Sequence, residues 1–289
     1  MNKLKSHRTA VDRIVFGLII LCAILALIPL IWLIFDLFIK GYKQINFDFF
    51  TQVSPTPLEA YLSHLGKQII PGGILNGISG SFLVIVIATV IAVPLGILGG
   101  LFMYDNHSPR FSSFFHYSIF SLLGIPPVIT GIVVYLWIVE PLHGFSALAG
   151  GISLAIVMLP MIIYTTFKAL ETLPRNIKED GAVLGGTYTS IIFRIVLPTV
   201  RDKIISGILV AISRAVGVTS PLIITALGAP EINWNIDHPV STISVLIWNF
   251  FNNSDMVNMV WTTTLFLFLT VIVLNIIAKG IYYGQKLHT

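Results

Sequence analysis

The sequence predicts an all-α, polytopic membrane protein that crosses the bilayer about six times. Hydrophobic residues make up 55% of the 289 residues and charged residues only 10%, whereas soluble domains carry roughly 25% charged residues. The mean hydropathy is +0.90, so lipid must solvate much of the chain. The alternation of apolar and polar residues that a membrane barrel needs is absent, and helices then satisfy the backbone inside the bilayer.

Six stretches reach the roughly 20 residues that a helix needs to cross the hydrocarbon core. The first, at about 14–38, follows a basic N-terminal stretch, 1–13. Its apolar run exceeds the roughly 7–15 residues of a cleavable signal peptide, so we expect a retained helix. Five further spans complete one transmembrane domain over 14–289, and they are expected at about 73–103, 112–139, 146–168, 203–228 and 257–282.

Prolines fall inside several of these spans. They are Pro94, the pair Pro126-Pro127, Pro160 and Pro221. Each removes a backbone donor and bends or interrupts its helix, although membrane helices tolerate single prolines. Together they favour kinked helices that line a pathway over a rigid anchor.

The distribution of positive charge predicts the orientation. Of the 17 lysines and arginines, 13 fall on the side of the two termini and the segment 171–202, and three fall on the other side. Cytoplasmic loops are enriched in Lys and Arg, so we expect both termini, including 1–13, in the cytoplasm. The basic excess then belongs to the membrane surface and not to a nucleic-acid site. A single cysteine, Cys22, excludes an internal disulfide and a cysteine-based metal site.

The segment 171–202 is the one large cytoplasmic loop, and its pattern is helix, glycine, helix. Glu179-Asp180-Gly181 is followed after three residues by Gly185 and after nine more by Ile195-Val196-Leu197-Pro198. Gly185 tolerates the turn between two short helices. An apolar stripe at helical spacing follows, formed by Ile191, Ile192, Ile195 and Val196. Either a partner protein or the lipid headgroups must cover such a stripe.

Arg214 interrupts the fifth span. It lies about 15 Å into the span at the 1.5 Å rise of a helix, where an arginine costs at least about 2.5–3.5 kcal/mol. Hydroxyl-bearing residues share the span, namely Ser206, Ser213, Thr219, Ser220 and Thr225. A guanidinium among hydroxyls suits an oxyanion held by bidentate hydrogen bonds. The alternative is a structural arginine paired with a carboxylate of a partner subunit.

The loop spacing resembles the EAA loop of ABC importer permeases, which reads Glu-Ala-Ala, three residues, Gly, nine residues, Ile-x-Leu-Pro. Only Asp180 and Gly181 depart, because they replace the usual alanines. The resemblance implies that the loop docks in a cleft of a separate ATPase subunit and transmits its closure. The residues implied in this coupling are Glu179, Asp180, Gly181, Gly185, Ile195, Leu197 and Pro198.

Further landmarks resemble the permeases of phosphate importers, the PstA family. They lie at 72–80, 92–96, 145–151 and 209–228. The resemblance implies inorganic phosphate as the substrate. The implied substrate pathway contains Arg214, Thr219, Ser220, Thr165 and Thr166.

Three positions depart from that family. Val218 stands where a glutamate is usual, and Tyr164 and Phe167 stand where an arginine and a glutamate flank the threonine pair. Of these charged positions Arg214 alone is retained. Another oxyanion or small solute is therefore an alternative substrate.

The resemblance also implies a complex in the plasma (inner) membrane. It would contain a second, PstC-like permease, PstB-like ATP-binding subunits and a PstS-like extracytoplasmic phosphate-binding protein. The sequence has no Gly-x-x-x-x-Gly-Lys-Ser/Thr loop. We therefore expect a transport subunit that is not an enzyme and binds no cofactor itself, with ATP used by the partner.

Two other classes compete with this interpretation. Gly77-Ile78-Ser79-Gly80 matches the short signature of intramembrane rhomboid-type serine proteases, but the seven histidines lie at ends, loops or span edges, and the serine needs one at membrane depth. A secondary transporter would show an internal repeat between its halves, and none is evident.

Overall fold

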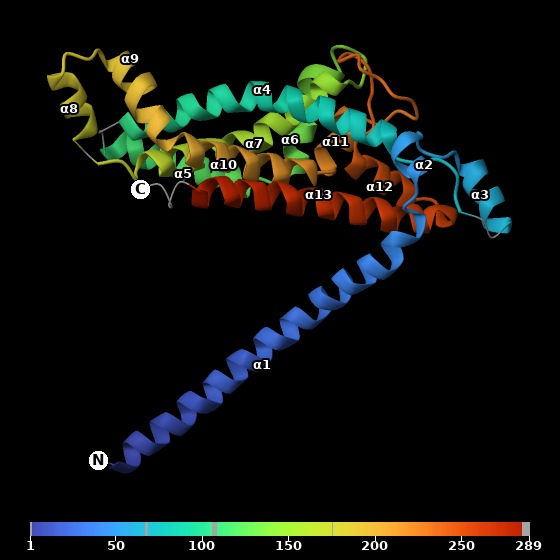
Figure 1. Ribbon diagram of the computed structural model, residues 1–289, viewed down its shortest axis with the longest axis horizontal. Helices are drawn as coiled ribbons and strands as arrows, with labels where there is room; N and C mark the ends of the chain where they lie inside the picture. Colours follow the sequence, from blue (N-terminus) through green and yellow to red (C-terminus); the bar gives the residue numbers. More distant parts are fainter. Residues whose placement is uncertain (1, 67–68, 106–108, 175, 285–289) are drawn as a thin grey trace.

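The computed structural model describes residues 2–66, 69–105, 109–174 and 176–284, and in these residues every regular element is helical (Figure 1). The long helices are α1 (Asn2–Gly41), α4 (Leu75–Asp105), α5 (Pro109–Gly124), α7 (Ala147–Leu170), α10 (Leu197–Val216) and α13 (Val257–Gly284). The short helices are α2 (Phe47–Thr51), α3 (Pro57–Leu65), α6 (Pro127–Val134), α8 (Ile177–Val183), α9 (Tyr188–Ile191), α11 (Ser220–Thr225) and α12 (Ile243–Phe251). The all-α fold that the sequence predicts is confirmed.

Four helical segments within the described residues are long and apolar enough to cross a membrane, and a bent pair would make a fifth. The four are Val15–Gln44, Leu75–Asp105, Ala147–Leu170 and Ser254–Gly284. The expectation of about six spans therefore exceeds the number of helices that meet this criterion. Two expected spans do not meet it: 112–139 is bent, and the helix α10 of the span 203–228 carries Arg201, Asp202, Lys203 and Arg214.

The span expected at 112–139 is not one straight helix. The segments Phe114–Gly124 and Pro127–Val139 meet at a bend of 92°. Pro126 adopts an extended conformation (ψ 132°) immediately before Pro127, which opens α6. A residue that precedes proline is driven out of the helical region, and the proline ring can only start the next helix. The proline pair thus interrupts the span.

The span expected at 203–228 is also divided. α10 begins earlier, at Leu197, and ends at Val216, and α11 covers only Ser220–Thr225. Pro221 occupies the first turn of α11, a position where its missing N–H costs nothing. In contrast, Pro94 and Pro160 lie inside α4 and α7 without interrupting them.

The centre of the bundle is the contact between α4 and α7. A Cβ added at Gly96 would lie 2.5 Å from Ile162 Cγ2, and one at Gly100 would lie 2.6 Å from Thr166 Cβ. These contacts advance by four residues along both helices, so the two helices run parallel and nearly touch. The buried core around them includes Val84, Ala88, Leu154, Met158, Ala211 and Leu222.

α1 stands apart from the bundle in Figure 1 and meets it near its C-terminal end. There a Cβ at Gly41 would lie 2.8 Å from Leu265 Cβ, and the rings of Phe38 and Phe268 pack edge to face at 6.5 Å. Farther along, Trp32 is 70% exposed. An apolar helix of this length needs lipid or another subunit around it.

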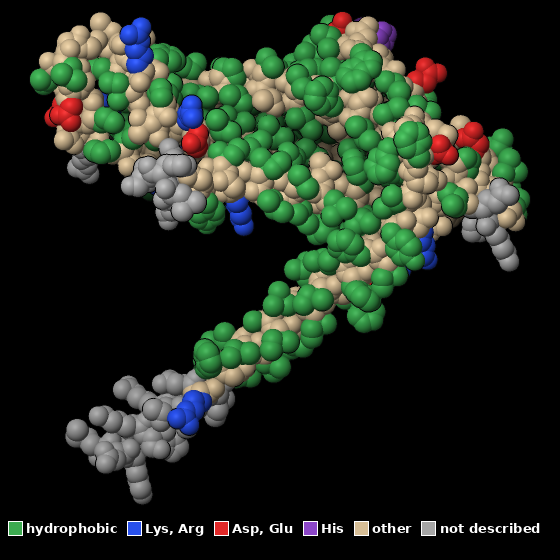
Figure 2. All heavy atoms as spheres, viewed as in Figure 1, with side chains coloured by type: hydrophobic (Ala, Val, Ile, Leu, Met, Phe, Trp, Pro, Cys, Tyr) green, Lys and Arg blue, Asp and Glu red, His purple; other side chains and the backbone are tan. Residues whose placement is uncertain are grey.

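The two ends of the bundle differ. Figure 1 places α8 and α9 at one end and α2, α3 and α12 at the other. In Figure 2 hydrophobic side chains cover the middle of the bundle, while charged side chains gather toward its ends. This banding is the pattern that a bilayer imposes on a spanning protein.

Candidate functional site

The loop at the α8–α9 end folds as two short helices joined by a glycine turn. α8 ends at Val183, and Thr187 Oγ1 caps α9 by accepting from the Ser190 N–H at 3.4 Å. A π-helical turn (Ile192–Val196) then leads into α10. Gly185 has φ +81°, with open space around the position of a Cβ. Its conformation, which L side chains rarely adopt, therefore calls for glycine at this turn.

Gly181 brings the two short helices together. It is buried, and a Cβ there would lie 3.0 Å from Ile191 Cγ1. The Gly186 N–H donates to the Gly181 carbonyl at 3.1 Å. The glycine that replaces a family alanine thus allows α8 and α9 to approach closely, which sequence reasoning missed because the contact is tertiary.

The apolar stripe of 191–196, which we expected a partner protein or lipid to cover, mostly faces the protein's own core. Ile191, Ile192 and Val196 are 5%, 3% and 0% exposed and pack with Leu101 and Leu170. Only Ile195 of that stripe is substantially exposed. The stripe is covered because the loop folds back onto the ends of α4 and α7, and this corrects the sequence-based expectation.

A different set of apolar side chains is exposed. We call it the loop tip, and it consists of Val183, Leu184, Tyr188 and Phe193, which are 87%, 86%, 61% and 60% exposed. Glu179, Asp180 and Pro198 are exposed as well, and Leu197 is partly buried. The loop tip is an apolar surface on a polar-flanked protrusion, which is typical of a protein contact.

Arg214 lies in the last turn of α10, where a positive charge interacts favourably with the helix dipole. Its side chain is exposed on the surface of the single chain, and no hydrogen bond or ion pair joins it to another described residue. Thr219 and Ser220 lie just beyond the break and are partly buried. The guanidinium is therefore available to a ligand or to another subunit.

The threonine pair lies elsewhere. Thr165 Oγ1 donates back to the Met161 carbonyl at 2.9 Å, and Thr166 is fully buried against Gly100 of α4. Gly207, the α10 residue that contacts Thr165, precedes Arg214 by seven residues, or about two helical turns. Arg214 thus lies near Thr219 and Ser220 along the chain, at the end of α10 and the start of α11, whereas Thr165 meets α10 about two turns earlier, at Gly207.

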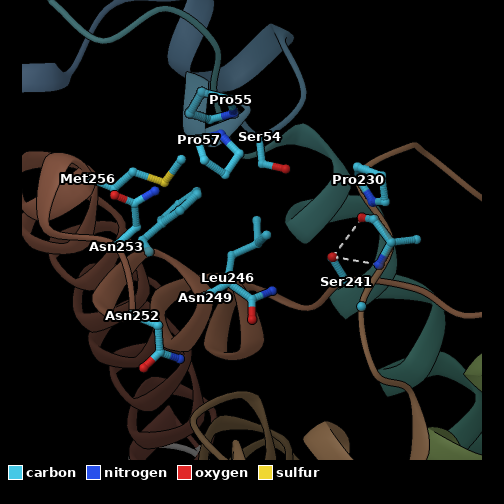
Figure 3. A pocket seen from close by; sticks show the side chains of 13 residues that line it. Ser54, Pro55, Pro57, Pro230, Ser241, Leu246, Asn249, Asn252, Asn253 and Met256 are labelled. Atoms are coloured by element: carbon cyan, nitrogen blue, oxygen red, sulfur yellow. Dashed lines mark hydrogen bonds between the residues drawn. The ribbon is translucent and has the colours of Figure 1, made fainter. Parts of the chain in front are cut away.

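A cavity of about 420 Å³ opens at the end of the bundle opposite the loop tip (Figure 3). We call it the outer pocket. Its polar lining includes Ser54, Ser241, Asn249, Asn252 and Asn253, and its apolar lining includes Leu246 and Met256. No local pattern in the sequence predicts this pocket, because the segment 54–57 forms its walls together with the distant segments 228–230 and 241–256.

Asn76, at the start of α4, joins two walls of this pocket. Its amide nitrogen donates to Ser54 Oγ and to the Ala229 carbonyl, both at 3.0 Å, and its oxygen accepts from the Ser54 N–H at 3.1 Å. Nearby, hydrogen bonds from the backbone N–H and then the hydroxyl of Thr56 lower the pKa of Glu59. Glu59 lines a neighbouring cavity together with Ser54, Pro55 and Gly72, so its carboxylate lies beside the outer pocket and not in its wall.

The protease signature serves packing. Ser79 Oγ donates to the Asn76 carbonyl at 3.1 Å and is buried, and Gly77 lies against Leu246. In the described part of the chain no three His, Cys, Asp or Glu side chains converge to hold a metal ion.

Known proteins match this chain over most of its length. Residues 92–285 match the family described as "Binding-protein-dependent transport system inner membrane component". The chain is 31% identical over 279 residues to the phosphate transport system permease protein PstA of Haemophilus influenzae, covering 95% of each chain. It is 29% identical over 247 residues to the probable phosphate transport system permease protein PstA of Methanocaldococcus jannaschii, covering 85% of this chain and 84% of the relative.

A solved structure has the same fold. An inward-facing conformation of the MetNI methionine ABC transporter matches with a TM-score of 0.56 and 15% identity, over 72% of this chain and 92% of that chain. At this identity the likeness concerns the fold alone.

Proposed function

The chain belongs to the family of binding-protein-dependent transport system inner membrane components, and on that premise we propose that it is the membrane-spanning permease subunit of an ABC importer for inorganic phosphate. The observation that carries the proposal is the nearly full-length similarity to phosphate transport permeases, combined with a protruding helical loop whose exposed tip is apolar. We propose phosphate as the substrate because several relatives are named phosphate transport system permease proteins.

The loop tip docks on a separate ATP-binding subunit. Val183, Leu184, Tyr188 and Phe193 enter its cleft, while Glu179 and Asp180 stay at the rim, where both side chains are exposed. Gly181 and Gly185 set the shape of the loop, and Ile195, Leu197 and Pro198 join it to α10. ATP is bound and hydrolysed by that partner, and this chain transmits the movement.

Arg214, Thr219 and Ser220 form this chain's half of the anion pathway. An exposed guanidinium in a lipid-facing position would be costly, so a second permease subunit covers this face and completes the path. Thr165 and Thr166 support the pathway through helix packing. Val218, which is partly buried in the core beside the break, carries no charge to compete with the anion.

The ends of the bundle have opposite roles. The α8–α9 end and both termini face the cytoplasm of a plasma-membrane protein, in agreement with the excess of Lys and Arg. The opposite end, with the outer pocket, receives an extracytoplasmic phosphate-binding protein.

Phosphate uptake tests the proposal directly. The chain is expressed with its cognate ATPase, second permease and binding protein in a bacterium that lacks high-affinity phosphate uptake, and radiolabelled phosphate is measured. ATP-dependent uptake that disappears when this chain is omitted is expected. Uptake that persists without ATP or without the ATPase would refute the importer mechanism.

Competition distinguishes the alternative substrate. The uncharged residues Tyr164 and Phe167 occupy positions that are charged in the family. Both pack against α5: the ring centroids of Tyr164 and Phe120 are 5.4 Å apart, and those of Phe167 and His116 are 4.8 Å apart. If excess sulfate or another oxyanion blocks uptake better than phosphate does, that oxyanion is the substrate.

A further inference from the structure

Lys178 and Asp105 connect the segment 171–202, which we call the coupling loop, directly to α4. The Lys178 ammonium donates to the Asp105 carboxylate and lies 4.1 Å from the centroid of the Tyr104 ring. We propose that this contact is the joint through which α8 moves the α4–α7 pair when the ATPase closes. The inference rests on the proposed function, and Lys178 lies just before the residues that the family pattern assigns to coupling.

The pair differs from other ion pairs of the chain in the elements that it joins. Lys40–Asp36, Lys168–Glu171 and Arg201–Asp202 each join residues at most four positions apart. Lys178 and Asp105 are 73 positions apart. Their side chains are only 24% and 25% exposed, so solvent and salt screen their attraction less than that of a fully exposed pair.

Neither charge suits its own helix. Lys178 lies in the first turn of α8, and Asp105 is the last residue of α4. The helix dipole disfavours a cation at an N-terminus and an anion at a C-terminus. Each charge is therefore stabilised by the other helix, and the contact is tertiary in origin.

Tyr104 extends the connection into the bundle. Its ring packs against the cluster that contains Leu101, Leu170 and Ile192, and also against the cluster that contains Ile119 and Phe167. Lys178 therefore rests on a side chain wedged between the coupling loop and the α5–α7 contact. Because α4 nearly touches α7 at Gly100, a displacement of α8 moves both helices together.

The experiment compares variants in the assembled importer. Lys178→Met keeps the length of the side chain without its charge, and Asp105→Asn keeps the shape of the carboxylate. The double variant Lys178→Asp with Asp105→Lys restores an ion pair of opposite polarity. Lys168→Met is the matched control, because it also removes one ion-paired lysine. The partner of Lys168 is Glu171, three residues away at the end of the same helix, so this pair does not join two helices.

Three quantities are measured for each variant: co-purification with the ATPase, the ATPase rate, and the phosphate imported per ATP hydrolysed. We expect each single variant to assemble normally and to lower the phosphate imported per ATP by about fivefold or more, a typical size for coupling between sites. The charge swap should recover most of that loss, and Lys168→Met should match the wild type.

Some outcomes overturn the inference. Lys178→Met with the wild-type phosphate-to-ATP ratio would do so, and so would loss of the ATPase from the Lys178→Met complex, because the pair would then serve assembly. A single-variant defect that the charge swap does not repair would also contradict a charge-based joint. Failure of the wild-type complex itself to transport phosphate would instead count against the proposed function.

Discussion

Thr165 on α7 and Gly207 on α10 touch across the bundle: a Cβ built on Gly207 would lie 2.5 Å from Thr165 Oγ1. The hydroxyl of Thr165 is turned back to the carbonyls of Met161 and Ile162, at 2.9 and 3.2 Å. A residue that the family resemblance assigns to the substrate pathway thus sets the spacing of two helices in this chain. The contact leads to the first prediction.

Gly207→Val should lower the stability of the protein by about 1–3 kcal/mol, because an added side chain in a tight core forces the helices apart. Thermal unfolding of the purified protein in detergent measures the effect. Gly217→Ala is the control, since the nearest neighbour of its Cβ would be the Arg214 carbonyl oxygen at 3.8 Å. Equal unfolding temperatures for the two variants would contradict the tight contact.

Gly185 should tolerate asparagine and not valine. At φ +81° a β-branched residue is strained by at least about 1–2 kcal/mol, whereas asparagine enters this region more readily. Because the space around the site is open, the loss concerns the shape of the turn. Co-purification of the ATPase should fall for Gly185→Val and persist for Gly185→Asn, and the reverse order would refute this explanation.

Leu184 and Ile192 should respond differently to aspartate. Leu184 is 86% exposed and Ile192 is 3% exposed. Leu184→Asp should release the ATPase without altering thermal stability, whereas Ile192→Asp should destabilise the protein, because it places a carboxylate in an apolar cluster. Retention of the ATPase by Leu184→Asp would exclude the loop tip as the docking surface.

Arg214→Ala should impair substrate binding without impairing the fold. A hydrogen bond to a charged group is worth about 1.5–3 kcal/mol, so the KM for phosphate should rise about tenfold or more. Arg214→Lys should recover part of the loss, since it keeps the charge but not the planar fork. Unchanged uptake kinetics in a correctly assembled Arg214→Ala importer would remove this residue from the pathway.

Local patterns predicted the helices and several of their ends. The proline pair at 126–127 predicted an interruption, because proline acts on the backbone of its own segment. The coupling pattern at Gly185 predicted a turn for the same local reason. The 92° size of the bend had no such signal, because packing between helices sets that angle.

The sequence by itself determined that lipid surrounds much of this chain, that its elements are helices, and that the basic segment 171–202 follows a helix–glycine–helix pattern. Hydropathy, charge and glycine or proline chemistry act within one segment and can be followed along the chain. Only the tertiary structure decided that Ile192 is buried while Leu184 is exposed, that Arg214 is separated from Thr165, and that Lys178 meets Asp105. Those outcomes depend on contacts between segments that lie far apart in the chain, and no periodicity within a single segment encodes which neighbour it will meet.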